Sequence, residues 1–320
     1  MASELQLVLV GELPGPAWWR DTVDLLDHLE SRWSRFLPDS DVSRLNIAAG
    51  HPVQVDSTTI TLLTAMTDAW HATEQRFDPC TLRALLAAGY RSSIDDPRRV
   101  TVLPSGAVHL THQQCDGDGL RNDDPTLERI EIDPDTCTVR LPTGLSIDAG
   151  GIGKGLAADL GVANALRSGA EGALVSIGGD LSMGGHPPDG GWVVAIEHPE
   201  PERGTLGSVA VPGGGVATSS TRSRRWQRFG RERHHVIDPW TGAPSTTDLS
   251  SVTVIARSGW LAEAHATAAI LAGSSEVIEY LDRHELSGLA VTDDHRVLVT
   301  DDLTELRPKP ASASMTGAAR

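Results

Sequence analysis

Residues 148–180 read DAGGIGKGLAADLGVANALRSGAEGALVSIGGD and contain a glycine-rich turn, a helical stretch and an apolar strand in direct succession. The turn, residues 150–155, leads into a helix predicted over residues 154–166. An apolar strand at residues 173–177 ends on a second glycine turn, and strand patterns then follow one another with no helix before residue 259. Helices in clusters and strands in runs, without strict alternation, predict an α+β fold rather than a doubly wound sheet.

Hydrophobic periodicity and turn residues place the other elements. Helices are predicted at residues 21–36, 58–74, 82–89, 259–271 and 275–283. Strands are predicted at 5–10, within 100–110 and 130–147, at 192–197, 208–211, 234–237 and 251–256, and in a hairpin at 289–292 and 296–300. Residues 39–46 and 115–125 are polar and are predicted as loops. We expect one domain over residues 1–306, built of mixed or antiparallel sheets with flanking helices, and a disordered tail at 307–320.

The overall charge of the chain restricts its partners. The 320 residues carry a formal net charge of -16, which disfavours nucleic acid and anionic membrane surfaces, where Lys and Arg must neutralise phosphates. A small anionic ligand then needs a metal ion or a local basic group to offset the repulsion. The three cysteines, Cys80, Cys115 and Cys137, fit no zinc pattern and argue against a disulfide framework. Without a signal peptide or a bilayer-spanning apolar run, the chain as given is expected to be cytoplasmic, with an exported precursor as the alternative.

Three polar segments are candidates for binding an anion. The glycines around Lys154 let backbone amides approach an anion at a helix start, and the lysine adds a positive charge, although the spacing excludes a Walker loop. Gly179 and Asp180 follow an apolar strand, and a carboxylate beside a tight turn suits ligand hydroxyls or a metal ion. Thr218 and Ser219 can donate hydrogen bonds to phosphate oxygens. For each segment the structural alternative, an ordinary turn or polar loop, stays open.

A basic stretch and a histidine pair follow. Six arginines between residues 222 and 233 are a local exception in an acidic chain, and they either steer an anionic cofactor or partner or form a solvated arm. Adjacent residues in an extended segment point to opposite faces, so only one of His234 and His235 can serve a given site. A histidine that is neutral near pH 7 is the usual general base, and Asp238 could orient it or bind metal. A purely structural role for this segment is the alternative.

Glu263 and Thr267 lie four residues apart and therefore share one face of the helix predicted at 259–271. A carboxylate and a hydroxyl in that arrangement suit a hard cation such as magnesium, which prefers oxygen ligands. The alternative is a threonine hydroxyl bonded back to the carbonyl of residue 263. The surrounding alanines indicate that the glutamate is buried, and a buried glutamate needs a partner, which favours the metal site.

Taken together and in this order, these segments resemble the FAD:protein FMN transferase (ApbE) family from about residue 33 to residue 299. The matching stretches are RFLPDSDVSRLN at 35–46, FDP at 77–79, DAGGIGKG at 148–155, IGGD at 177–180, ATS at 217–219 and HVIDPWTG at 235–242. An alanine-rich helix with an acid and Thr267 completes the set, with Glu263 where the family usually has aspartate. The stretches at 217–219 and 235–242 are the most specific.

The resemblance implies a cleft for FAD between a core and a smaller helical subdomain, with Phe36 near the isoalloxazine ring. The cofactor-binding positions on this reading are Phe36, Phe77, Asp78, Lys154, Gly179, Asp180, Thr218 and Ser219. A magnesium ion would be held by the backbone carbonyl of Gly151 together with Glu263 and Thr267. The base would be His235, with Asp238 returning toward the same cleft.

The resemblance also implies an activity, the Mg²⁺-dependent transfer of FMN from FAD to a Ser or Thr hydroxyl of an acceptor flavoprotein, with release of AMP. Two alternatives stay open. With water as acceptor the same residues would make an FAD pyrophosphatase, and without catalysis the chain would be a flavin-binding or flavin-delivery module. The expected partners are therefore FAD and an acceptor flavoprotein, with no nucleic acid and no integral membrane segment.

Overall fold

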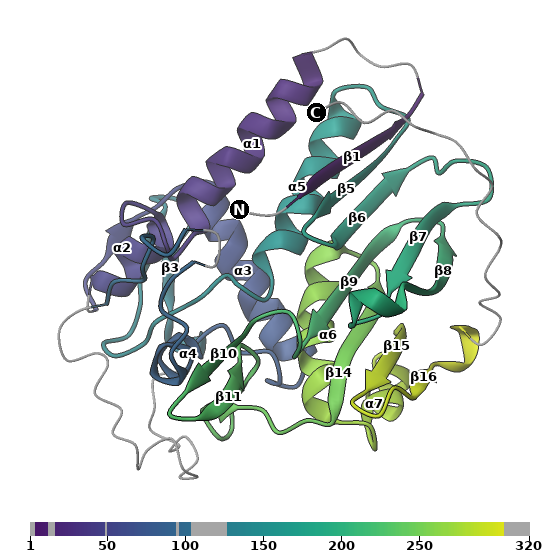
Figure 1. The fold of residues 1–320 in the computed structure, drawn as a ribbon. Helices are drawn as coiled ribbons and strands as arrows, with labels where there is room; N and C mark the ends of the chain where they lie inside the picture. Colours follow the sequence, from purple (N-terminus) through teal and green to yellow (C-terminus); the bar gives the residue numbers. More distant parts are fainter. Residues whose placement is uncertain (1–3, 12–16, 49, 94–95, 104–126, 304–320) are drawn as a thin grey trace.

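The fold is described by a computed structural model for residues 4–11, 17–48, 50–93, 96–103 and 127–303 (Figure 1). The predicted tail at 307–320, the predicted loop at 115–125 and most of the predicted strand region at 100–110 lie outside these residues. Within them, the chain forms seven α-helices and sixteen β-strands, which confirms the α+β class.

The centre of the fold is a seven-stranded sheet in which neighbouring strands run antiparallel. The order is β1 (Leu5–Val10), β5 (Gly172–Ile177), β6 (Asp180–Gly185), β9 (Gly214–Ser220), β14 (Leu249–Ala256), β15 (Ser287–Thr292) and β16 (Val297–Val299). β5 is buried along its whole length. Its short apolar run is typical of a strand that is covered on both faces.

Helices α5 (Gly153–Arg167) and α6 (Gly259–Ala272) cover one face of this sheet (Figure 1). α5 packs on β5 and β6, α6 packs on β9 and β14, and α7 (Val277–Arg283) lies against α6 and β15. The first turns of α5 and α6 meet backbone to backbone, because a Cβ added at Gly155 would lie 2.3 Å from the Gly259 carbonyl oxygen. Two glycines therefore bring together the helix starts that carry Lys154 and Glu263.

We expect Gly155→Ala to destabilise the fold by about 1–3 kcal/mol, because the added methyl group has to push the two helices apart. The free energy of unfolding, measured by urea denaturation, gives the test. Gly207→Ala is the matched control, since a Cβ at Gly207 would meet no atom within 4 Å. A Gly155→Ala protein as stable as this control would contradict the close backbone contact.

The N-terminal helices form a second part of the fold, at the left of Figure 1. They are α1 (Ala17–Trp33), α2 (Asp41–Ile47), α3 (Ser57–Ala72) and α4 (Leu82–Ala88). A small sheet of β2 (Val53–Gln54), β4 (Thr138–Arg140) and β3 (Glu131–Asp133) accompanies them. One apolar cluster, which includes Leu29, Met66 and Ile152, continues from these helices to α5.

Three two-stranded hairpins complete the fold. They are β7 (Trp192–Glu197) with β8 (Thr205–Val211), β10 (Arg225–Arg228) with β11 (Arg231–His234), and β12 (Ile237–Asp238) with β13 (Ala243–Pro244). Short 3₁₀ helices lie at Leu127–Arg129, Pro201–Arg203 and Asp301–Leu303. No helix in the described ranges is long and apolar enough to cross a membrane.

The loop predicted at residues 39–46 is wrong, because α2 lies there. Ser40 caps this helix by accepting a 3.0 Å hydrogen bond from the Ser43 amide. The Asp41 carboxylate, which polar character alone would place in solvent, is buried and accepts a 2.9 Å hydrogen bond from the Thr59 hydroxyl. A tertiary partner therefore allows a polar segment to form a helix.

Two further segments differ from their predictions. Thr218 and Ser219, for which a polar loop was the structural alternative, belong to strand β9 in the middle of the large sheet. Residues 234–237, predicted as one strand, are divided, because β11 ends at His234 and β12 begins at Ile237. The break between these strands leaves His235 outside both hairpins, while the Val236 carbonyl still accepts a 3.0 Å hydrogen bond from the Ser245 amide.

Candidate active site

A cavity of about 1340 Å³ opens where the N-terminal helices, the glycine turn before α5 and the large sheet come together. Pockets for drug-sized molecules measure about 300–1,000 Å³, so this cavity has room for a ligand the size of a dinucleotide. All but one of the predicted site residues line it: Phe36, Phe77, Asp78, Gly151, Lys154, Gly179, Asp180, Thr218, Ser219, His235, Glu263 and Thr267. The exception is Asp238.

Lys154 and Asp180 meet at a tight turn. β5 ends at Ile177 and β6 begins at Asp180, and the residues between them, Gly178 and Gly179, have φ values of 60° and 91°. Two successive positive φ values are typical of a type I′ hairpin turn, which glycine adopts without steric strain. The turn holds the Asp180 carboxylate at the cavity, where it accepts a hydrogen bond from Lys154 Nζ.

Lys154 also donates to Glu263, so one ammonium group serves two buried carboxylates. Glu263 is 3% exposed, and its other oxygen accepts a 2.8 Å hydrogen bond from the Gly155 amide. Burial raises the pKa of Glu263 to about 7, with Lys154 opposing the rise and Asp180 adding to it. Burial lowers the pKa of Lys154, but the two carboxylates outweigh it and raise that pKa well above its usual range. With one positive and two negative groups, the ionised cluster carries a net charge of -1.

A pair of hydroxyl groups lies beside this cluster. Thr267 Oγ1 and Ser219 Oγ are 3.0 Å apart, and a Cβ added at Gly151 would lie 3.6 Å from the same threonine oxygen. The glycine turn, β9 and α6 therefore meet at Thr267. The Thr218 amide donates to Asp180 at 3.3 Å, which joins the hydroxyl pair to the charged cluster.

The first turn of α6 is held by a carboxylate from α5. The Asp159 side chain accepts hydrogen bonds from the Gly259 amide at 2.8 Å, the Trp260 amide at 3.0 Å and the Ser182 hydroxyl. Ser258 is at the N-cap position but makes no capping bond with its side chain, so Asp159 caps the helix instead. Burial raises the pKa of Asp159, while these hydrogen bonds oppose the rise. The contact fixes α6, which carries Glu263, relative to α5.

Phe36 belongs to a group of aromatic side chains at the cavity. Its ring packs edge-on against Tyr90, with centroids 6.2 Å apart, and Tyr90 stacks on Trp226 of β10 at 5.5 Å. The guanidinium group of Arg35 lies 4.1 Å from the Phe36 centroid and 4.9 Å from that of Tyr90. Arg35 is buried and pairs with Asp148 at 3.0 Å, so it ties the aromatic group to the start of the glycine turn.

Phe77 and Asp78 lie between α3 and α4 and line the same cavity. A Cβ added at Gly151 would approach Phe77 Cε2 to 2.9 Å, so the glycine allows the turn to lie against this ring. The Asp78 carboxylate accepts a 2.7 Å hydrogen bond from the Cys80 amide, and burial raises its pKa. Phe77 is thus held against the glycine turn, and the Asp78 carboxylate is held by the amide of Cys80 two residues further along the chain.

Only one of the two histidines reaches the cavity, and it is His235. The His234 ring donates from Nε2 to the Ser245 carbonyl at 3.1 Å. His235 Nδ1 is buried and has no hydrogen-bond partner among the described residues, so no internal bond competes for that nitrogen. Asp238 does not return to the cavity as expected, because its carboxylate accepts a 2.9 Å hydrogen bond from the Trp240 amide and holds the next turn.

The surroundings of His235 keep its ring neutral. Burial lowers the pKa of His235 to about 3, and the positive charges of Arg224 and Lys154 act in the same direction. The expectation of a base that titrates near neutrality is therefore wrong for the free protein. An exposed histidine in the unfolded chain binds a proton near pH 6.5, so this partly buried ring, which stays neutral, makes the fold less stable as pH falls through that value.

We expect a nuclear magnetic resonance titration of the free protein to show no protonation of His235 above about pH 4. Adding FAD should raise this pKa, because the two negative charges of the pyrophosphate favour a charged imidazole if they lie near Lys154. His235→Ala identifies the signal, and the ring of His234 serves as an internal comparison. A pKa near 6.5 for His235 in the free protein would contradict its buried environment.

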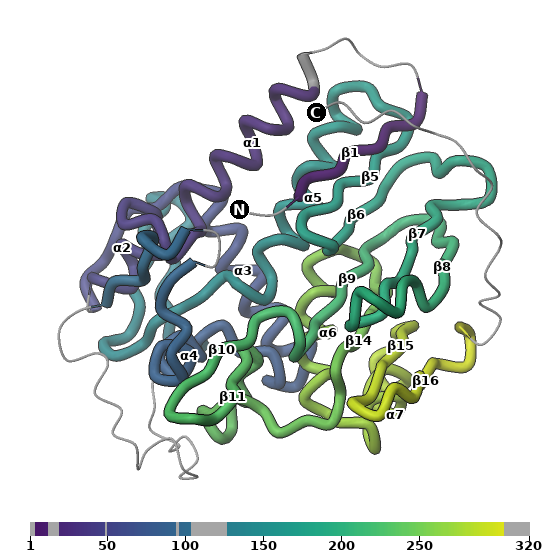
Figure 2. The backbone as a smooth tube through the Cα atoms, in the orientation of Figure 1, coloured from purple at the N-terminus to yellow at the C-terminus, as the bar shows by residue number. Residues whose placement is uncertain are grey.

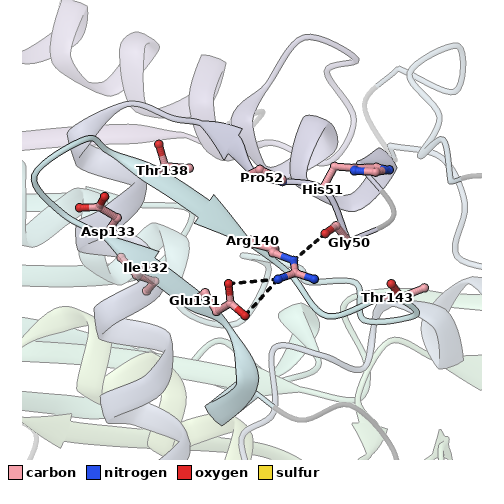
Figure 3. A pocket seen from close by; sticks show the side chains of 9 residues that line it. All are labelled: Gly50, His51, Pro52, Glu131, Ile132, Asp133, Thr138, Arg140 and Thr143. Atoms are coloured by element: carbon pink, nitrogen blue, oxygen red, sulfur yellow. Dashed lines mark hydrogen bonds and ion pairs between the residues drawn. The ribbon is translucent and has the colours of Figure 1, made fainter.

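A second pocket, of about 620 Å³, lies on the small three-stranded sheet (Figure 3). There Arg140 donates to the Gly50 carbonyl at 2.8 Å and pairs with Glu131 at 3.3 Å. It contains none of the predicted site residues, and its charged pair is already satisfied. In the part of the chain that the structure describes, no three His, Cys, Asp or Glu side chains form a group that could hold a metal ion.

Comparisons with known proteins identify relatives of the chain. The model of the ApbE family matches residues 1–291. The chain is 28% identical to an FAD:protein FMN transferase of Rhodobacter capsulatus over 85% of its own length and 50% of that protein, so it spans half of this relative. Identity to an FAD:protein FMN transferase of Vibrio cholerae serotype O1 is 27%, over 84% and 78% of the two chains. The crystal structure of the ApbE protein of Thermotoga maritima shares the fold, with a TM-score of 0.78, 23% identity and 96% coverage of both chains.

Proposed function

The chain belongs to the ApbE family, and we propose that it transfers the FMN part of FAD to a Ser or Thr hydroxyl of an acceptor flavoprotein, with release of AMP. Relatives of this chain carry the name FAD:protein FMN transferase. The observation that carries the proposal is that His235, with an unpartnered ring nitrogen, lines the same cavity as the Lys154 cluster and the hydroxyls of Thr218 and Ser219. A base and a set of phosphate-binding groups in one cavity are what phosphoryl transfer requires.

In the proposed reaction, a bond forms between the acceptor hydroxyl oxygen and the phosphorus of the FMN half of FAD. The bond from that phosphorus to the bridging oxygen breaks, and the bridging oxygen leaves with AMP. The hydroxyl proton passes to the neutral ring of His235, which contributes about 10²–10⁴-fold to the rate as a general base. Bound pyrophosphate strengthens this base, because its negative charges offset those of Lys154 and Arg224.

Several groups are arranged to hold the FAD pyrophosphate. The glycine turn lies at the N-terminus of α5, where the helix dipole favours an anion, although the amides of Gly150, Gly153 and Gly155 already donate to groups within the protein. Lys154 contributes the positive charge, and the hydroxyls of Thr218 and Ser219 can donate to phosphate oxygens. Phe36 and its neighbour Tyr90 offer aromatic surface for the flavin ring.

The residues at Thr267 fit a magnesium ion. The Thr267 hydroxyl, the Gly151 carbonyl and the Glu263 carboxylate are hard oxygen donors, which magnesium prefers. When all three groups are ionised, the Lys154, Asp180 and Glu263 cluster also carries a net negative charge that a cation would offset. A magnesium ion held there would supply charge neutralisation for the pyrophosphate oxygens.

AMP release tests this function against its alternatives. The protein is incubated with FAD and magnesium, with and without candidate acceptor proteins, and the mass of each acceptor is then measured. We expect AMP to form only with a suitable acceptor, which gains the mass of an FMN phosphoester. Equal AMP formation without acceptor would indicate a pyrophosphatase, and FAD binding without AMP under any condition would indicate a binding or delivery module.

A further inference from the structure

The β10–β11 hairpin concentrates positive charge in an acidic protein. Residues 222–233 contain six arginines and a single acidic residue, Glu232, while the whole chain has a net charge of -16. The hairpin lies beside α4 (Figure 2), because Trp226 Nε1 donates to the Ala88 carbonyl at 2.8 Å. A cluster of like charges on one short hairpin is destabilising in itself, so its presence calls for a partner.

Three of the six arginines have partners within the chain. Arg222 pairs with Asp293 at 3.0 Å, and Arg225 pairs with Glu232 at 3.1 Å. Arg228 donates to the Ala87 carbonyl at the C-terminal end of α4, where a helix favours a cation. These three guanidinium groups are therefore accounted for by the fold.

The other three arginines, Arg224, Arg231 and Arg233, form no ion pair with any described residue, and we call them the hairpin surface. Arg231 is exposed, and the other two are half-buried. Arg231 also lies directly opposite Arg228 in the strand register, an arrangement that repels unless an anion lies nearby.

The position of the hairpin surface indicates which ligand supplies the negative charge. Arg224 and His235, which flank the pair Arg225 and His234 at the open end of the hairpin, line the cavity, whereas Arg231 and Arg233 do not. The pyrophosphate-binding groups lie inside the cavity around Lys154, so the two outer arginines are not needed for FAD. They lie instead on β11, two and four residues before His235 in the chain.

We propose that the hairpin surface binds acidic residues of the acceptor protein next to its modified hydroxyl, an inference that rests on the proposed function. Arg233 and Arg231 precede His235 by two and four residues, about 7 and 13 Å of extended chain. An acceptor segment lying extended along the hairpin would cover the same distances. Its acidic residues are therefore expected two to four positions from the hydroxyl, and their charge would also favour the correct direction of approach.

Peptide binding tests this surface without turnover. The probes are three rhodamine-labelled peptides with one central Thr, flanked at positions two to four on both sides by Glu, Gln or Lys. Fluorescence anisotropy is measured with FAD present and magnesium absent. We expect the Glu peptide to bind at least about tenfold more tightly than the Gln peptide at low salt, and the difference to shrink at high salt.

The double variant Arg231→Glu, Arg233→Glu should lose the preference for the Glu peptide and bind the Lys peptide most tightly, with unchanged FAD binding. The matched control is Arg129→Glu, Arg167→Glu, which makes the same charge change at two exposed arginines outside the hairpin and should keep the preference. Three outcomes would overturn the proposal. Both double variants could lose the preference equally, or the parent protein could show no preference for the Glu peptide. Single-stranded oligothymidylate could also compete for binding more strongly than the Glu peptide. If the protein transferred no FMN in the AMP-release experiment, the proposed function would be refuted instead. The two failures are distinguishable, because the anisotropy experiment measures peptide binding without FMN transfer.

Discussion

His235→Ala should lower the rate of FMN transfer by about 10²–10⁴-fold at saturating FAD and magnesium, because the variant lacks the side chain that we propose as the base for the hydroxyl proton. FAD should still bind, since the groups that we propose hold its phosphates are on the glycine turn and β9. The measurement is single-turnover transfer to an acceptor, together with FAD binding by flavin fluorescence. A loss of turnover with retained binding separates a catalytic role from a role in cofactor binding.

His234→Ala is the matched control for that experiment. Its ring hydrogen-bonds the Ser245 carbonyl outside the cavity, so its removal should cost roughly 1 kcal/mol of stability and leave turnover near that of the parent protein. If His234→Ala is the inactive variant, the assignment of the base is reversed. If both variants turn over normally, neither histidine is the base and the hydroxyl is activated in another way.

Local patterns predicted most of the elements. The strands Leu5–Val10 and Trp192–Glu197 have the predicted bounds, and the helix predicted at 154–166 extends by one residue at each end. These elements follow from hydrophobic periodicity and from turn residues that lie next to them in the chain. α2 was not predictable in this way, because its polar residues are stabilised by partners such as Thr59, which only the tertiary fold brings near.

The candidate site likewise has some features that local sequence predicts and others that depend on tertiary contacts. Burial of Glu263 was predictable from its alanine neighbours, and the type I′ turn at Gly178 and Gly179 from the glycine pair. The cap of α6 by Asp159 was not, because the carboxylate and its amide partners are 100 or more residues apart. Nor was the low pKa of His235 predictable, since burial and the charges of distant residues determine it.

The double variant Glu263→Gln, Thr267→Ala should weaken magnesium binding by at least about 100-fold, because loss of outer-shell partners alone usually costs 10–100-fold and here two proposed direct ligands change. The fold should persist. Glu263→Gln removes the excess negative charge of the cluster with Lys154 and Asp180, and Thr267→Ala removes one hydroxyl, for which about 1 kcal/mol is typical. Isothermal titration of magnesium into the protein with bound FAD measures the affinity directly, and thermal unfolding checks the fold.

Two conservative variants separate loss of a ligand from loss of packing. Thr267→Ser keeps the oxygen and should keep most of the magnesium affinity, whereas Thr267→Ala should not. Glu263→Asp keeps the carboxylate but shortens its reach, so it should lower affinity less than Glu263→Gln, which keeps the shape and loses the charge. Magnesium affinity that is unchanged in the double variant would remove both residues from the metal site.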